Sequence, residues 1–464
     1  RGLGDVYKRQ RLSYGTSGSD NISSNLWRET WSSLGSGSNH TPINGELGSF
    51  YRPDGLLANS KLKWETTISR NFGIDFGFLN NRVNGSLEVY WNTTKDLLMA
   101  VPVDNTTGYS YQFQNFGKTS NRGIELSVNV DVINKGDFRF NVGAIYNYNR
   151  NKLDELPNAD QYLYSSYWGS SSLVPTNDYM FVEGKAIGLV RGFISEGYYT
   201  VDDFNYTNGQ YVLKEGVPDI TKALTATYMH PYDLPAGQTA FPGAAKFRDV
   251  DESGTVDLDD ATCLGEVMPR HTGSFQLNFN YKNFDLSTNF NWTAGGKVYN
   301  VAAMINASGQ EFDGIGAQRA SWVADAFKVY NVNAAGDLYA VTNPDELRAL
   351  NANAKYHLPY HQSGITSSEW LENGSYLRLQ TLTLGYTLPK NWLTKVHVDK
   401  IRLYLTATNL FTITGYSGID PEVNANPTGQ SGFYSDLRIF PTLNMDFGTY
   451  PRARTFTFGA NITF

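Results

Sequence analysis

The sequence predicts an all-β protein in which antiparallel strands form a transmembrane β-barrel with long loops at one rim. Three observations lead to this fold class. Segments of alternating apolar and polar residues recur along most of the 464 residues, and this alternation gives a strand one apolar face and one polar face. No run approaches the ~20 apolar residues that a membrane-spanning helix needs. Short turns alternate with long loops between the strands, which is typical of membrane barrels.

The alternation is clearest in the last strand, residues 454–464. The residues predicted for its apolar face are Phe456, Phe458, Ala460, Ile462 and Phe464. The residues predicted for its polar face are Thr455, Thr457, Gly459, Asn461 and Thr463. In a soluble sandwich the apolar face would pack against a second sheet. In a membrane barrel it would contact lipid, and the polar face would line a wet interior.

Most other strands form predicted hairpins. After the end of a strand at residues 11–14, the paired segments are 61–78 with 83–92, 124–132 with 138–148, 179–182 with 187–199, and 275–281 with 284–292. Single strands follow at residues 376–388, 401–411 and 454–464. The predicted total is roughly twelve strands. The long loops, which all fall on the same rim, are residues 15–60, 99–119, 151–178, 201–269, 301–370 and 415–452.

Composition excludes other classes of protein. A net charge of −7 leaves no basic stripe that could neutralise nucleic-acid phosphates. A single cysteine, Cys263, cannot form an intramolecular disulfide. No signal peptide precedes the first strand, so we expect that it was removed or that the chain is a fragment. Residues 1–10 fit no strand or cap pattern, and we expect them to be non-native, with the barrel in residues 11–464.

Four stretches carry a recognisable family pattern. They are residues 62–98 (LKWETTISRNFGIDFGFLNN…), residues 115–133 (NFGKTSNRGIELSVNVDVI), residues 247–287 (FRDVDESGTVDLDD…YKNFDLS) and residues 375–423 (SYLRLQTLTLGYTLP…NLFTITGYSGIDPEV). They resemble the C-terminal barrel of SusC/RagA-type TonB-dependent outer-membrane receptors. Each stretch alone is a weak signal, but together they cover nearly all of residues 11–464 and are specific.

The resemblance implies a barrel of about 22 strands, of which this chain supplies the C-terminal part. No match to a plug domain, a TonB box or an N-terminal domain is found. The resemblance also implies nutrient import across the outer membrane of a Bacteroidota-like Gram-negative bacterium. The expected partners are a SusD-like surface lipoprotein and the TonB-ExbB-ExbD complex, and the expected cargo is an oligosaccharide or a peptide. A siderophore or cobalamin receptor and a secreted carbohydrate-binding sandwich are the alternatives.

An acidic loop has the spacing of a calcium loop. Its candidate oxygen ligands are Asp249, Asp251, Ser253, Thr255, Asp257 and Asp260, with Gly254 at the position of the sharp turn. Hard cations require several converging oxygens, and this spacing wraps the chain to provide them. The last position is Asp where EF-hands have a bidentate Glu. The alternative is a solvated acidic loop tip that holds no metal.

Aromatic residues in the predicted outer loops are candidate ligand contacts, because sugar rings stack on aromatic faces. The candidates are Tyr109, Tyr111, Tyr167, Trp168 and Tyr360. Interfacial girdles and loop packing use the same residue types. The polar strand faces would line the lumen through Glu125, Asn129, Asn141, Asn147, Asn278, Asn289 and Asn291.

No enzymatic constellation is evident. His357 and His361 stand four residues apart, but Pro359 between them breaks any helix that would align them. Asp249 and Asp251 could be imagined as a glycosidase acid pair, yet nothing in the sequence builds the apolar pocket that would raise one pKa. We therefore expect a chain that is not an enzyme.

Overall fold

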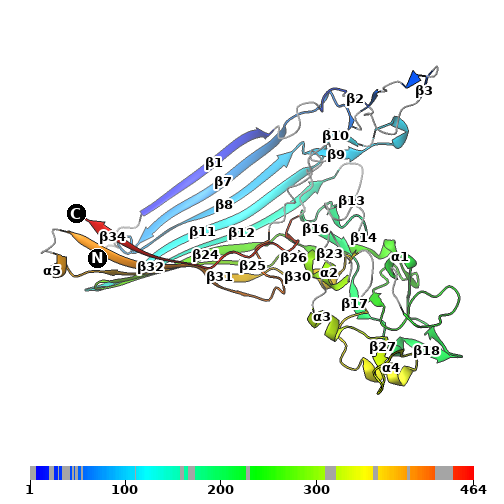
Figure 1. Ribbon diagram of the computed structural model, residues 1–464. Coiled ribbons are helices and arrows are strands. Elements are labelled where there is room, and N and C mark those ends of the chain that lie inside the picture. The colour runs from blue at the N-terminus through cyan, green and yellow to red at the C-terminus, as the bar shows by residue number, and fades with distance from the viewer. Residues whose placement is uncertain are drawn as a thin grey trace.

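The computed structural model describes residues 7–19, 26–29, 31–33, 42–43, 46–47, 51–53, 56–109, 111–156, 161–165, 173–225, 230–308, 320–358, 364–393, 398–423 and 443–464. Within them, one ten-stranded antiparallel sheet dominates. Its strands, in sheet order, are β1 (Tyr7–Ser19), β7 (Glu65–Phe78), β8 (Val83–Lys95), β11 (Lys118–Lys135), β12 (Phe138–Glu155), β24 (His271–Tyr281), β25 (Phe284–Ala294), β31 (Tyr376–Thr387), β32 (Lys400–Thr414) and β34 (Thr455–Thr463). The sheet is curved like part of a barrel wall, and β1 and β34 form its two edges (Figure 1).

The register places apolar side chains together on the convex face. Ile462 lies opposite Ile401, and Phe458 lies opposite Leu405. The row continues through Leu384, Leu286, Phe279 and Phe140. No layer of protein covers this face, since Leu405 and Leu384 within the row are 43% and 45% exposed and Phe458 on the edge strand is 73% exposed. A sandwich would bury this face between sheets. The exposed apolar face therefore supports the membrane barrel over the soluble alternative.

Three connections at one end of the sheet are tight turns. The β7–β8 turn contains Asn80 and Asn81, and the β11–β12 and β24–β25 turns contain Gly136 and Lys282, all with positive φ. The two-residue turns at 136–137 and 282–283 need such left-handed residues to match the twist of the strands. The fourth connection at this end, between β31 and β32, is longer and contains α5 (Lys390–Leu393).

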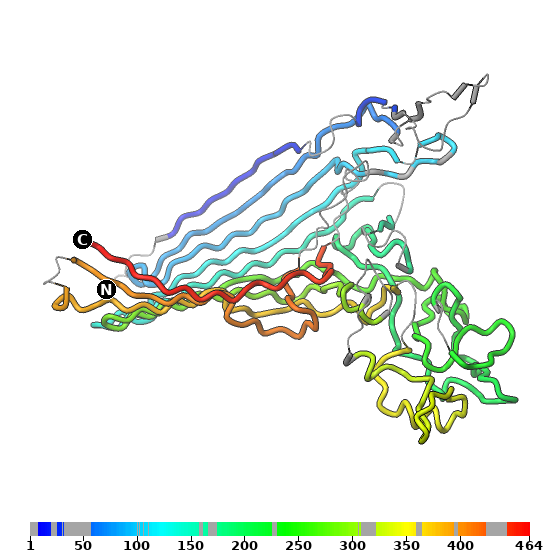
Figure 2. Tube along the Cα trace, in the orientation of Figure 1, coloured from blue at the N-terminus to red at the C-terminus, as the bar shows by residue number. Residues whose placement is uncertain are grey.

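The other end of the sheet carries the long excursions, which fold into small sheets and helices (Figure 2). The four-stranded small sheet contains β13 (Gln161–Tyr164), β15 (Tyr179–Val182), β16 (Leu189–Gly192) and β23 (Thr262–Glu266). The three-stranded sheets are β6 (Leu56–Leu57) with β10 (Tyr111–Asn115) and β9 (Leu98–Pro102), and β30 (Leu371–Asn373) with β26 (Lys297–Asn300) and β33 (Met445–Asp446). The two-stranded sheets are β2 (Trp31–Ser33) with β5 (Tyr51–Pro53), β3 (Pro42–Ile43) with β4 (Glu46–Leu47), β14 (Leu173–Val174) with β29 (Gly364–Ile365), β17 (Ser195–Tyr198) with β21 (Ala245–Phe247), β18 (Phe204–Thr207) with β19 (Gln210–Leu213), β20 (Asp219–Ile220) with β22 (Thr255–Val256), and β27 (Tyr330–Val332) with β28 (Leu338–Ala340). The helices are α1 (Lys222–Thr225), α2 (Val301–Ser308), α3 (Ala320–Asp325), α4 (Pro344–Leu350) and four short 3-10 helices at Asn105–Thr107, Val201–Asp203, Leu258–Asp260 and Ser368–Trp370.

The buried cores of the described residues lie mainly in these excursions. One core next to the sheet contains Tyr179, Tyr299 and Met304. A second core, farther along the excursions, contains Phe193, Tyr199 and Leu224. We call the structure built by the excursions the cap. In the cap, apolar side chains are buried by protein, whereas on the sheet's convex face they are exposed.

The fold class predicted from the sequence is confirmed, with a correction to the number of strands. Tyr179–Val182 and residues 187–199, predicted as a hairpin of the barrel, belong to the cap as β15, β16 and β17. The predicted loops 151–178 and 201–269 are therefore parts of one excursion between β12 and β24, and the main sheet has ten strands in the part of the chain that is described. Tyr179, Met180 and Phe181 are all buried, so β15 has two apolar faces where a barrel strand has one.

Residues 7–10, expected to be non-native, lie in β1 opposite Gly77 to Ile74. Their origin stays a prediction. None of the helices formed by the described residues is long and apolar enough to cross a membrane.

Candidate functional site

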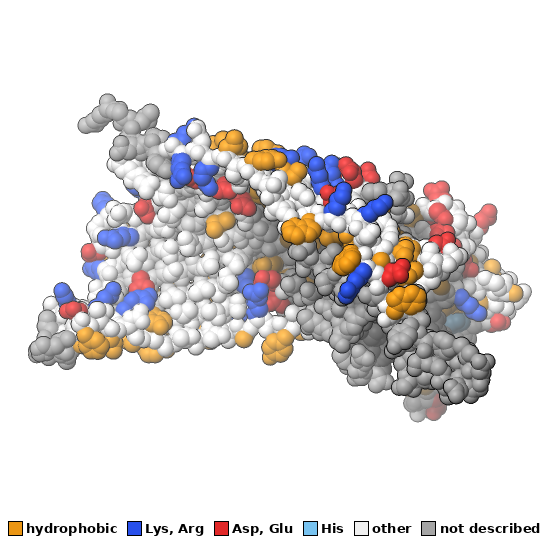
Figure 3. Space-filling view, turned by 90° about the horizontal axis from the view of Figure 1, so that it is seen from above, with side chains coloured by type: hydrophobic (Ala, Val, Ile, Leu, Met, Phe, Trp, Pro, Cys, Tyr) orange, Lys and Arg blue, Asp and Glu red, His pale blue; other side chains and the backbone are white. Residues whose placement is uncertain are grey.

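The concave face of the sheet is polar. Glu125 lies opposite Asn147, and Asn141 lies opposite Asn278. The other predicted lumen residues, Asn129, Asn289 and Asn291, share this face through the strict alternation of their strands. Figure 3 shows this face as mostly neutral side chains and backbone, with basic and acidic side chains close together. The residues predicted to line the lumen therefore lie on the concave face of the sheet.

Polar side chains are hydrogen-bonded to one another across the concave face. Asn291 donates from Nδ2 to Gln380 Oε1 at 2.7 Å, and Ser287 Oγ donates to Asn278 Oδ1 at 2.7 Å. Asn141 Nδ2 donates to Asp131 Oδ1 at 2.9 Å. These bonds fix the wall's side chains in place while leaving further amide groups available to a polar partner.

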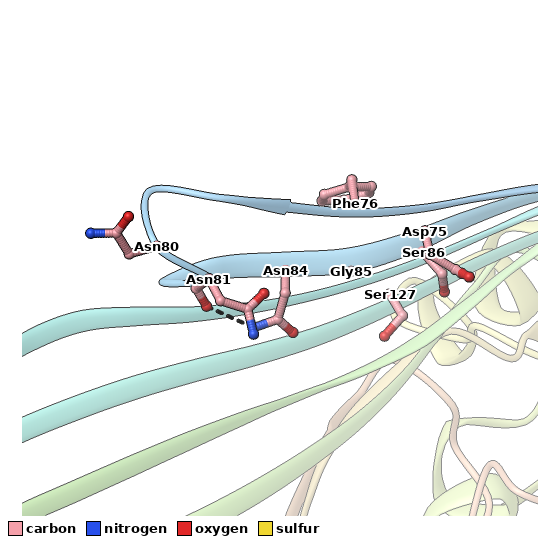
Figure 4. A pocket seen from close by; sticks show the side chains of 8 residues that line it. All are labelled: Asp75, Phe76, Asn80, Asn81, Asn84, Gly85, Ser86 and Ser127. Atoms are coloured by element: carbon pink, nitrogen blue, oxygen red, sulfur yellow. Dashed lines mark hydrogen bonds between the residues drawn. The ribbon is translucent and has the colours of Figure 1, made fainter. Parts of the chain in front are cut away.

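A wide hollow of about 740 Å³ lies on this face near the β7–β8 turn. Figure 4 shows Asp75, Ser86 and Ser127 on the hollow's side of the strands and Phe76 on the opposite side. A second hollow, of about 310 Å³, lies at the middle of the wall and includes Gln276 and Asn289. Both hollows are open depressions of the wall, lined by a mixture of polar and apolar atoms.

Ion pairs neutralise much of the charge on the concave face. Arg402 donates to both oxygens of Asp285, with Nε–Oδ1 at 2.9 Å and Nη2–Oδ2 at 2.5 Å. Gly385 lies directly beneath this pair, where a Cβ would come within 2.5 Å of both partners. Near the β1 edge, Arg11 contacts Asp75 at 2.9 Å and Glu88 at 2.7 Å.

A buried arginine joins the wall to the cap. Arg378, on the loop side of β31, is 2% exposed. Its Nη2 contacts Asp420 Oδ1 at 2.5 Å, its Nη1 contacts Glu422 Oε2 at 3.0 Å, and its Nε donates to Thr412 at 3.0 Å. This cluster fixes residues 415–423, the segment that follows β32, against the rim. Sequence reasoning did not single out Arg378, although its place on the polar face of a strand was a usable signal.

The same segment has two further anchors. Glu372 accepts from Ser417 N at 2.7 Å and from Ser417 Oγ at 2.6 Å. Tyr416 OH donates to Asp446 Oδ2 at 2.6 Å. Residues 415–423 are therefore held by β30, β31 and β33 together, and the cap is attached firmly to the barrel rim at this point.

The acidic loop brings three of its six candidate ligands together. One carboxylate oxygen from each of Asp249, Asp251 and Asp260 lies within 4.8 Å of the others. Asp260 is buried and accepts from Val250 N at 2.5 Å and Asp257 N at 2.8 Å. Hydrogen bonds from Ser253 hold the pKa of Asp251 below its ordinary value.

The rest of the loop is organised around a sharp turn. Gly254, with a φ of +87°, donates to Asp249 Oδ2 at 2.7 Å, as expected for the turn position. Asp257, the fourth carboxylate among the candidates, lies outside the three-carboxylate group, and Ser253 N donates to Asp249 Oδ1 at 3.1 Å and to Asp251 Oδ1 at 2.9 Å. The assignment of a metal to this loop stays a prediction.

Two of the five aromatic ligand candidates lie within the described residues. Tyr109 and Tyr111 are half-buried in the excursion between β8 and β11, and Tyr111 pairs with Pro102 in the small sheet. Tyr167, Trp168 and Tyr360 lie outside the described residues. His357 is buried and bonds to Leu358 O at 2.8 Å, which fits a structural role. The expectation that the chain is not an enzyme stays a prediction.

An exposed apolar convex face, a polar concave face, short turns at one end and a folded cap at the other define the wall of a membrane-spanning β-barrel. The chain belongs to the family of TonB-dependent receptor β-barrels, because the family model described as "TonB dependent receptor-like, beta-barrel" matches residues 9–410. The family resemblance predicted from the sequence is confirmed, and the protein is an outer-membrane protein.

Several curated proteins are similar over most of this chain. TonB-dependent receptor P3 of Formosa agariphila is 30% identical over 455 residues, which are 98% of this chain and 39% of that protein. TonB-dependent receptor SusC of Bacteroides thetaiotaomicron is 27% identical over 416 residues, which are 88% of this chain and 32% of that protein. The chain thus spans less than two fifths of the length of these relatives.

A solved structure of the RagAB peptide transporter has the same fold. It superposes with a TM-score of 0.65 at 22% identity, covering 98% of this chain and 41% of that chain.

Proposed function

We propose that the protein is the outer-membrane component of a TonB-dependent importer of nutrients, with an oligosaccharide or a peptide as its cargo. The observation that carries this proposal is the polarity of the sheet. Its convex face offers apolar side chains to lipid, and its concave face offers amide and hydroxyl groups to a polar solute. Membership of the TonB-dependent receptor family supports the same reading.

The cap supports import over passive diffusion. The excursions bury two apolar cores at the loop end of the barrel, and the Arg378 cluster attaches them to the rim. A folded cap of this kind provides a surface on which a cargo or a second protein can dock. We propose that its partner is a SusD-like surface lipoprotein and that energy comes through TonB-ExbB-ExbD.

Uptake in the source bacterium tests this proposal. A strain that lacks the gene should lose accumulation of at least one fluorescently labelled oligosaccharide or peptide, and the wild-type gene should restore it. A protonophore should abolish the same uptake in the parent strain, because TonB coupling depends on the inner-membrane proton gradient. The proposal fails if the deletion strain takes up oligosaccharides and peptides normally but loses ferric siderophore or cobalamin uptake.

We also propose that the acidic loop holds Ca²⁺ and thereby stiffens the cap. The approach of Asp249, Asp251 and Asp260 supports this, because it brings one oxygen of each carboxylate within 4.8 Å of the others, close enough to share one hard cation. We expect a dissociation constant of about 0.1–1 mM, as for extracellular calcium modules.

Calcium should raise the melting temperature of the cap of the full-length protein, and a chelator should reverse the rise. Asp260→Asn should remove the effect. Asp259→Asn is the matched control, because Asp259 is an exposed neighbour outside the three-carboxylate group. An equal response to calcium in the wild type and Asp260→Asn would contradict the assignment.

A further inference from the structure

The convex face changes from apolar to basic toward the loop end of three strands. On β11 the outward run Val130, Val128, Leu126 and Ile124 ends at Arg122. On β12 the run that ends in Tyr146 and Tyr148 is followed by Arg150. On β7, Phe78, Phe76, Ile74 and Phe72 are followed by Arg70. We call Arg70, Arg122 and Arg150 the arginine patch.

The register brings two members of the patch face to face. Arg122 on β11 lies directly opposite Arg150 on β12, and Trp91 on β8 lies opposite Arg122 on its other side. Figure 1 shows β7, β8, β11 and β12 as neighbours in the wall. Like charges directly opposite each other on adjacent strands are destabilising, so this arrangement is unfavourable without an anion.

The described residues provide no acidic partner for this pair. Their ion pairs on the same strands use other basic residues: Lys118 contacts Glu155 at 3.0 Å, and Lys152 contacts Asp154 at 3.5 Å. Arg122 and Arg150 are both exposed, and neither takes part in an ion pair among the described residues. Two guanidinium groups on the outer surface are therefore available to an external anion.

The patch is local to one part of the wall and to one end of it. On β25, β31 and β32 the corresponding outward positions near the loops are Trp292, Leu377 and Ile413. At the opposite, short-turn end the outward runs of five strands, β7, β12, β24, β25 and β31, finish in aromatic residues, namely Phe78, Phe138, Tyr281, Phe284 and Tyr386. Among the described strands, arginines adjoin the apolar band at the end that carries the cap, whereas the short-turn end has the separate lysines Lys8, opposite Phe76, and Lys135, opposite Phe138. We place the cap end at the outer leaflet.

We propose that the arginine patch binds the phosphate of a phosphorylated glycolipid in the outer leaflet, the lipopolysaccharide class. A guanidinium pairs with phosphate oxygens through two parallel hydrogen bonds. One phosphate shared by Arg122 and Arg150 offsets their repulsion, and its acyl chains continue over Ile124 and Tyr148 toward the centre of the membrane. Trp91 offers its ring to the headgroup boundary, where Trp is favoured. The proposal rests on outer-membrane placement and is independent of the cargo.

Titration of the full-length protein in detergent tests this site. The probe is fluorescently labelled lipopolysaccharide, compared with the same lipid after enzymatic removal of its phosphate. The test variant is Arg122→Gln/Arg150→Gln. The control is Arg139→Gln, which removes the same charge from an exposed position of β12 on the concave face near the turn. Heat-modified electrophoretic mobility confirms that each variant forms a folded barrel.

Wild type and Arg139→Gln should bind the phosphorylated lipid equally. The double variant should bind it at least about tenfold more weakly, because two charge-assisted hydrogen-bond partners are lost. Arg122→Lys/Arg150→Lys should bind with intermediate affinity, since it keeps the charge and loses the paired geometry. Removing the phosphate from the lipid should weaken its binding to wild type by the same factor as the double substitution weakens binding of the intact lipid.

Three results would overturn the proposal. The double variant could bind like wild type, the dephosphorylated lipid could bind wild type as tightly as the parent lipid, or inorganic phosphate could displace the lipid at equal concentration. The last result would show a free-anion site in place of a lipid site. Cargo uptake is not part of this readout, so failure here leaves the importer proposal untouched.

Discussion

Replacing Arg378 by glutamine is predicted to release residues 415–423 from the barrel rim without unfolding the barrel. The arginine is the shared partner of Asp420 and Glu422, and it also donates to Thr412. Glutamine fits the space but supplies neither the charge nor the forked geometry. Asp420, only 9% exposed at its side chain, would be left with its charge uncompensated.

The expected magnitude follows from burial. Removing one partner of a buried ion pair costs about 3–5 kcal/mol, because the other charge stays desolvated and unpaired. Glu422 is 38% exposed at its side chain and keeps Arg452 as a partner at 2.7 Å, so we expect it to add little. When this loss lowers the free energy of local opening of residues 415–423, the equilibrium constant for that opening rises at least about a hundredfold.

Hydrogen exchange followed by mass spectrometry measures this opening directly. The amides to follow are those of Ser417 and Glu422, which donate to Glu372 and Asp420. The matched control is Arg402→Gln, since Arg402 forms a more exposed pair with Asp285 in the same wall. Protection of residues 416–422 should fall in Arg378→Gln and stay unchanged in Arg402→Gln. Unchanged protection in Arg378→Gln would refute the reasoning.

Two further predictions concern the wall and the cap. Gly385→Ala should destabilise the barrel by about 0.2–1 kcal/mol, because the new methyl would lie 2.5 Å from the side-chain ends of Arg402 and Asp285 and would displace this partly exposed ion pair. Gly415→Ala, in open space, should not destabilise it, and thermal loss of heat-modified mobility compares the two. In the cap, burial raises the pKa of Asp203, but Lys246 at 2.7 Å and the Thr200 amide outweigh it and hold the pKa below the ordinary value of 3.8. The stability that ionised Asp203 contributes is fully present above pH 3.8, and it is lost as the pH falls through the lower pKa that Asp203 has in the folded protein. Exchange protection near Asp203 should therefore fall in that acid range in wild type, and Asp203→Asn should show no such step.

The strands of the wall could be predicted from the sequence because their pattern is local. Alternation within β34, from Phe456 to Ile462, specifies which side chains meet lipid without reference to any other segment. The residues that line the lumen could be predicted from the same alternation along their strands. Three of the six candidate ligands of the acidic loop lie close together, since their positions depend on a short turn at Gly254, and their role as metal ligands stays a prediction.

The cap could not be predicted in this way. β15 was assigned to the barrel because it is short, apolar and next to a turn at Gly184, and those features do not distinguish a lipid-facing strand from a strand buried on both faces. The informative signal was the lack of alternation across Tyr179, Met180 and Phe181. Arg378 was missed for a related reason, because its partner Asp420 lies 42 residues away.

The difference between wall and cap has one physical origin. The wall finds its apolar partner in the membrane, so its sequence has only to keep polar and apolar residues on opposite faces. The cap is surrounded by water and must bury its apolar side chains against one another. It does so through contacts between distant segments, such as Tyr179 OH with Leu443 O, 264 residues apart, at 3.0 Å. No periodicity within either segment encodes that contact. A substitution in the wall that keeps its face and polarity should therefore be tolerated more readily than a change of size in the core of the cap.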